Sequence, residues 1–88
     1  MKNLKDLMKA LKIAEENANM ADAAWENDPE NKDLEITFDK AYAKEHEALE
    51  NLVDEIVKVT SGKIDQKTAR TMVIKKRSQL EALINRAA

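Results

Sequence analysis

The stretch Asn27-Asp28-Pro29 decides the fold, because it contains the one proline of this 88-residue chain. The second strong break is Ser61-Gly62, which contains the one glycine. Each break lies where one stripe of apolar residues at helical spacing stops and the next begins. Asp28 as an N-cap and Pro29 at the first helical position favour a helix start, and glycine favours a helix end. The sequence therefore predicts three helices, over residues 3–27, 29–61 and 65–87.

The other predicted helix ends also carry suitable residues. Asn3 is the expected N-cap of the first helix, with Asp6 in its first turn, where a carboxylate is favourable. Gly62 is expected to adopt the left-handed conformation that ends the second helix. We expect Asp65 to be the N-cap of the third helix, and Ile64 before it to form a hydrophobic staple.

Each predicted helix has one apolar face that needs a packing partner. The first face alternates in steps of three and four residues, the spacing typical of a coiled-coil seam. The sequence therefore predicts an all-α fold, either an antiparallel three-helix bundle or a long helical hairpin plus a third helix, with coiled-coil-like packing. Residues 1–88 are expected to form a single helical domain. The predicted core stripes are Leu4, Leu7, Leu11, Ala14, Ala18, Ala21 and Trp25; Leu34, Phe38, Tyr42, Leu49, Leu52, Ile56 and Val59; and Ala69, Met72, Val73, Leu80, Leu83, Ile84 and Ala87.

Composition excludes several classes of protein. The chain has no cysteine, which excludes a disulfide framework and a thiolate metal site and favours a reducing compartment. No apolar run approaches the roughly 18 residues needed to span a bilayer, and the N-terminus lacks the apolar core of a signal peptide. The sequence therefore predicts a soluble, cytoplasmic protein that does not bind a membrane.

The formal net charge of −2 hides an uneven distribution along the chain. Residues 28–62 carry ten acidic side chains against four lysines, whereas residues 63–88 carry seven basic side chains against two acidic ones. We expect the second and third helices to neutralise each other where they pack antiparallel. The pairs expected from that register are Asp54 with Arg70, Glu50 with Lys75, and Glu47 with Arg77.

Two charged residues fall in the middle of apolar faces. Glu45 interrupts the stripe of the second helix, and Lys76 interrupts that of the third. In an antiparallel pair that turns at Gly62, these two residues lie side by side. We therefore expect Glu45 and Lys76 to form a structural ion pair that fixes the helix register.

No group of residues forms a recognisable catalytic or cofactor site. The chain has no Ser-His-Asp arrangement, no glycine-rich phosphate loop and no cysteine nucleophile. The one histidine, His46, precedes Glu50 by one helical turn, but Ala43 stands where di-iron helical bundles place a glutamate. We therefore expect no enzyme activity, no metal, no cofactor and no small-molecule substrate.

Apolar residues on the outer helix faces favour a protein-binding role. Ile13 and Met20 lie opposite the core stripe of the first helix, and similar residues lie outward on the other two helices. The candidate partner-binding residues are Ile13, Met20, Ala24, Ile36 and Ile74. The sequence predicts a small helical protein-protein interaction module that forms a homodimer or binds another protein through helix faces.

Two alternative functions remain open from the sequence. The basic third helix could bind nucleic acid through Lys67, Arg70, Lys75 and Arg77, because a groove-binding helix needs cations for phosphates. The acid-rich second helix could instead inhibit another protein by competing for its nucleic-acid site. The acidic flanking helix and the negative net charge disfavour direct nucleic-acid binding.

Overall fold

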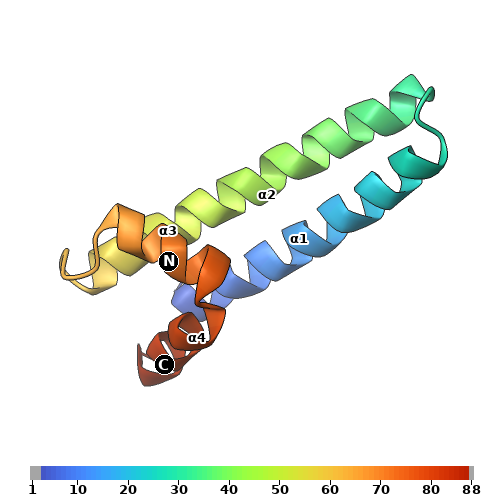
Figure 1. Ribbon diagram of the computed structural model, residues 1–88. Helices are drawn as coiled ribbons and strands as arrows, with labels where there is room; N and C mark the ends of the chain where they lie inside the picture. The colour runs from blue at the N-terminus through green and yellow to red at the C-terminus, as the bar shows by residue number, and fades with distance from the viewer. Residues whose placement is uncertain (1–2, 88) are drawn as a thin grey trace.

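A computed structural model describes residues 3–87, with only the backbone of Ala87. Within that range the chain forms four helices and no strand: α1 (Leu4–Asn27), α2 (Lys32–Val59), α3 (Gln66–Lys75) and α4 (Arg77–Ala87). The all-α prediction is confirmed. Helices α1 and α2 form a long antiparallel hairpin, and the shorter α3 and α4 lie across its open end, near residue 4 (Figure 1). The molecule is elongated, measuring 47 × 26 × 19 Å.

The first turn keeps its predicted position but uses different caps. Asn3 caps α1 as expected, accepting a hydrogen bond from the Asp6 amide at 2.9 Å. The prediction that Asp28 and Pro29 start the second helix is wrong. Asp28 instead ends α1, and Asn31 caps α2 by accepting hydrogen bonds from the amides of its first turn. Asn31 is the N-cap because its side-chain oxygen accepts hydrogen bonds from the Asp33 and Leu34 amides, at 3.0 and 3.4 Å.

The second turn follows the glycine prediction. Gly62 has a φ of +80°, and its N–H donates to the Val57 carbonyl at 2.9 Å, closing the last turn of α2. Asp65 caps α3 by accepting from the Thr68 amide at 2.7 Å. Ile64 is half-buried against the core. The predicted end of α2 was two residues too late, because Thr60 is already the C-cap.

The third helix is split, which corrects the prediction of one helix over residues 65–87. Lys76 leaves helical geometry, with φ −127° and ψ 51°, between α3 and α4. Its position in the apolar stripe lies between Val73 and Leu80, which are both fully buried. The break allows both apolar groups to reach the core while the lysine stays exposed. A straight helix would place the Lys76 ammonium against the core, at a large desolvation cost.

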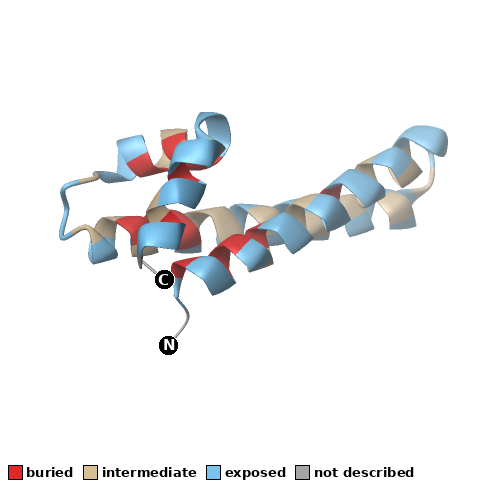
Figure 2. Ribbon diagram, turned by 90° about the horizontal axis from the view of Figure 1, so that it is seen from below, coloured by how far each residue is buried: buried red, intermediate tan, exposed pale blue. Residues whose placement is uncertain are grey.

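One hydrophobic core joins all four helices at the open end of the hairpin (Figure 2). Met8 belongs to this core although it was not predicted to be buried, and Val59, which was predicted to be buried, is exposed. Its fully buried side chains come from each helix, so that none of the four can pack without the others. The core consists of Leu4, Leu7, Met8, Leu11, Leu52, Val53, Ile56, Ala69, Met72, Val73, Leu80 and Ile84.

The other half of the hairpin extends beyond this core. We call residues 13–45 the distal arm; its one buried residue is Ala18. Trp25 and Phe38 pack with ring centroids 5.4 Å apart near its tip, and Phe38 stacks on Tyr42 at 6.1 Å. Trp25 and Phe38 are only half-buried, and Tyr42 is exposed, contrary to its predicted core position. The distal arm therefore contributes no residue to the core shared by the four helices.

A charged contact holds the junction between α3 and α4 against α1. The Arg77 guanidinium donates to both Glu15 carboxylate oxygens, at 2.8 and 2.9 Å. It also donates twice to the Val73 carbonyl at the end of α3, at 3.1 and 2.9 Å. Hydrogen bonding to Glu15 raises the pKa of Arg77 above its ordinary value. Arg77 thus ties the helix break to the hairpin with a planar, bidentate contact.

Replacing Arg77 should test this role. We expect Arg77→Met to lower the free energy of unfolding by about 1–2 kcal/mol, because it removes charge-assisted hydrogen bonds at a partly buried site. The matched control is Lys12→Met, which removes the 3.2 Å pair with Glu81, where both side chains are about half exposed. The control should cost no more than about 0.5 kcal/mol. Urea unfolding at fixed protein concentration measures both values, and equal effects would argue against a special role for Arg77.

Candidate protein-interaction surface

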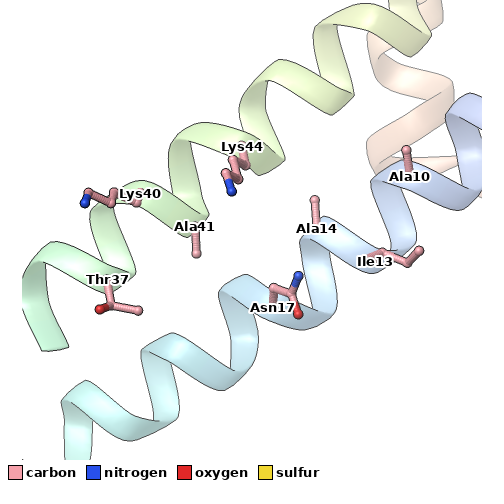
Figure 3. Close-up of a pocket in the computed structure, with 8 residues that line it drawn as sticks. All are labelled: Ala10, Ile13, Ala14, Asn17, Thr37, Lys40, Ala41 and Lys44. Atoms are coloured by element: carbon pink, nitrogen blue, oxygen red, sulfur yellow. The ribbon is translucent and has the colours of Figure 1, made fainter.

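A groove of about 380 Å³ runs between α1 and α2 in the distal arm. Alanines form its floor, and Figure 3 shows Ala14 of α1 and Ala41 of α2 pointing toward each other between the helices. One wall carries the cationic side chains of α2, and the other carries Ile13 and neutral residues of α1. The lining residues are Ala10, Ile13, Ala14, Asn17, Thr37, Lys40, Ala41 and Lys44.

Four of the five predicted partner-binding residues lie along this groove or next to it. Ile13 lines it, and Met20 and Ala24 continue the same face of α1, because the series Ile13, Asn17, Met20, Ala24 advances in steps of four, three and four. Ile36 lies one turn before the groove residue Lys40 on α2. Ile13, Met20 and Ile36 are 51, 65 and 50% exposed, whereas Ala24 is half-buried. The distal arm therefore exposes three large apolar side chains, two on α1 and one on α2.

Ile74, the fifth predicted residue, lies elsewhere. It is 60% exposed on α3 and lines a separate hollow of about 180 Å³ with Lys67, Arg70, Thr71 and Lys75. None of those residues lines the groove of the distal arm. The structure thus separates Ile74 from the other four candidates.

The structure divides the residues predicted for nucleic-acid binding. Arg70 donates to both carboxylate oxygens of Glu50, at 2.6 and 2.8 Å, and Arg77 is held by Glu15. Lys67 and Lys75 are exposed on α3. Two of the four cations are therefore paired with carboxylates within the chain, and the other two, Lys67 and Lys75, take part in none of the three ion pairs among residues 3–87.

The observed ion-pair partners differ from those predicted from the antiparallel register. Arg70 pairs with Glu50 rather than Asp54, and Arg77 pairs with a residue of α1 rather than with Glu47. Asp54 instead accepts a hydrogen bond from Gln66 at 3.3 Å. The predicted register failed because α2 ends earlier and the third helix breaks, so that α4 lies against α1.

The predicted ion pair between Glu45 and Lys76 does not form. The three ion pairs among residues 3–87 are Lys12–Glu81, Arg70–Glu50 and Arg77–Glu15. Lys76 is exposed at the helix break, while Glu45 is half-buried on the inner side of the hairpin. Burial and the nearby charge of Glu15 raise the pKa of the Glu45 carboxyl. Glu45 thus carries an unfavourable charge rather than a register-fixing one.

The raised pKa of Glu45 predicts a pH-dependent mutant. The folded protein holds this proton more tightly than the unfolded chain, so the ionised carboxylate destabilises the fold above the raised pKa. That penalty disappears as the pH falls through the raised pKa to the ordinary value of 4.5. We expect Glu45→Gln to stabilise the protein at neutral pH by less than about 1 kcal/mol, since the residue is only partly buried and water still screens its charge.

Thermal unfolding at neutral pH and below the ordinary glutamate pKa checks this expectation. The gain from Glu45→Gln should be absent under the acidic condition. Glu47→Gln is the matched control, because Glu47 is exposed two residues away on the same helix. A gain for Glu45→Gln that is equal at both pH values would contradict the assignment.

The other sequence candidates do not assemble into a chemical site. His46 is exposed, and no group of three or more His, Cys, Asp or Glu side chains in the described part of the chain is placed to hold a metal ion. None of the helices within residues 3–87 combines the length and apolar character needed to cross a membrane. The groove of the distal arm is the hollow beside which four of the five predicted partner-binding residues lie.

The groove also contains polar residues that were not predicted to bind a partner: Asn17, Thr37, Lys40 and Lys44. The spacing of Thr37, Lys40 and Lys44, in steps of three and four, was a signal that they share one helix face. No protein-family model, curated protein or solved structure matches this chain.

Proposed function

We propose that this chain is a helical protein-protein interaction module that associates with a second copy of itself through the distal arm. The observation that carries the proposal is the set of large apolar side chains beside the groove. Ile13, Met20 and Ile36 are each at least half exposed on a segment that lies outside the core. The role proposed is binding rather than catalysis, and it requires no metal, cofactor or small-molecule substrate.

Burial of these side chains supplies the driving force. Complete burial of one large apolar side chain contributes roughly 1.5–3 kcal/mol, so covering a half-exposed one contributes about 1 kcal/mol. The groove floor of alanines allows a partner helix to approach closely. A surface with this apolar centre and charged rim is typical of a specific interface.

A second copy is the simplest occupant of this surface. A chain of this size buries only a small core. Association with an identical chain increases the buried apolar surface and requires no second kind of chain. The distal arm has the fewest buried side chains, because none of its residues belongs to the core. A pair of arms would form a four-helix arrangement, in which the two helices of each arm pack against the two helices of the other.

Glutamate substitutions in the apolar surface test the proposal. We expect Ile13→Glu and Met20→Glu each to raise the Kd for self-association at least tenfold, because each places an unpaired carboxylate in the interface, at a cost of about 1–3 kcal/mol. Sedimentation velocity over a range of protein concentrations measures the association.

The matched control is Ile74→Glu, which makes the same change at a 60% exposed isoleucine outside the distal arm. It should leave the Kd unchanged, and circular dichroism should show the same helix content in all three variants. A wild-type chain that remains monomeric at millimolar concentration would refute self-association.

A further inference from the structure

We infer that the second copy binds with its α2 antiparallel to α2 of the first, in the register that places Asp33 of one copy against Lys44 of the other. This inference rests on the proposed self-association and specifies its geometry. Its basis is the pattern of charged residues on the groove side of α2, together with the symmetry of a two-copy contact.

The groove side of α2 carries charges in a regular series. Asp33, Thr37, Lys40 and Lys44 advance in steps of four, three and four residues, so they lie on one helix face. Thr37, Lys40 and Lys44 line the groove, and Asp33 extends the same face toward the hairpin turn. The face is therefore negative at the turn end and positive three helical turns further on.

These charges have no ionic partner in the described part of the chain. The three ion pairs among residues 3–87 involve none of Asp33, Lys40 and Lys44. Asp33, Lys40 and Lys44 are all exposed. The face thus has one acidic and two basic groups available for an external partner.

Two-fold symmetry makes this pattern complementary to itself. In an isologous contact, if residue i of one copy faces residue j of the other, then j also faces i. Antiparallel α2 helices that place Asp33 against Lys44 therefore form the ion pair twice. The same register places Thr37 opposite Lys40.

Other arrangements of the two helices are disfavoured by charge. A parallel pair in register would place Lys40 and Lys44 against the same residues of the other copy. An antiparallel pair shifted to place Lys40 against Lys44 would gather four ammonium groups around the symmetry axis. Like charges in contact select against both alternatives, so charge sets direction and register while apolar burial supplies affinity.

The groove is accessible to a second copy, because α3 and α4 lie on the other side of the hairpin. On α1, Lys12 and Glu15 contact Glu81 and Arg77 of α4. At about 100° per residue, the groove residues of α1 centre on the face roughly opposite Lys12 and Glu15; these groove residues are Ala10, Ile13, Ala14 and Asn17. The groove therefore opens away from α3 and α4.

Charge reversal in each copy provides a sharp test. We expect Asp33→Lys alone and Lys44→Asp alone each to raise the Kd of self-association about tenfold, because two attractive contacts become repulsive. An equimolar mixture of the two variants should form a heterodimer with a Kd near that of the wild type, since each reversed position then faces an opposite charge. The double variant should also regain self-association.

Glu35→Lys is the matched control, because it makes the same change in the first turn of α2, two residues from Asp33 and on another face. It should leave the Kd within about twofold of the wild type. Sedimentation equilibrium of the single variants, their mixture and the double variant measures the set, with one variant mass-tagged to identify heterodimers.

The outcomes separate this register from the proposed function. Recovery in the mixture and in the double variant supports the register. If Ile13→Glu weakens association but the charge reversals do not, the register is wrong and association through the distal arm stands. Equal weakening by Asp33→Lys and Glu35→Lys, without recovery in the mixture, also overturns the register. A monomeric wild type overturns both proposals.

Discussion

The shared core at the open end of the hairpin is the constraint on which the rest of the structure depends. Leu11, Leu52 and Leu80 come from three different helices and are at most 1% exposed. Each of these helices is amphipathic and has no other place to bury its apolar face. Because this core lies at one end, the remaining length of α1 and α2 has to extend into solvent as a two-helix arm.

The break at Lys76 follows from the same constraint. The last segment has to contribute Val73 and Leu80 to one core while it carries a lysine between them. Because the helix breaks at Lys76, the lysine side chain stays exposed. The Arg77 side chain then binds both Glu15 and the Val73 carbonyl at the end of α3. A side chain of the break itself thus compensates for the hydrogen bonds that a continuous helix would have made.

The sequence predicted the helices better than it predicted the contacts between them. The apolar stripes located α1, and glycine at position 62 located the end of α2 to within a few residues, because both signals are local. The break at Lys76 was missed because a charge within an apolar stripe is compatible with either a buried ion pair or a kink. The contacts of Arg77 with Glu15, and of Arg70 with Glu50, depend on where helices end, which sequence spacing defines least well. For the candidate surface, the exposed apolar residues were identifiable from helical periodicity, whereas the groove needed the relative placement of α1 and α2.

The one tryptophan of the chain lies at the far end of the arm from the core. Its indole nitrogen donates to the Pro29 carbonyl at 3.3 Å, and its ring packs on Phe38. The tryptophan fluorescence of this protein therefore reports on the hairpin tip and is insensitive to changes in the core at the open end of the hairpin. An unfolding curve recorded by tryptophan emission and one recorded by circular dichroism follow different parts of the molecule, and any gap between their midpoints measures how independently the tip frays.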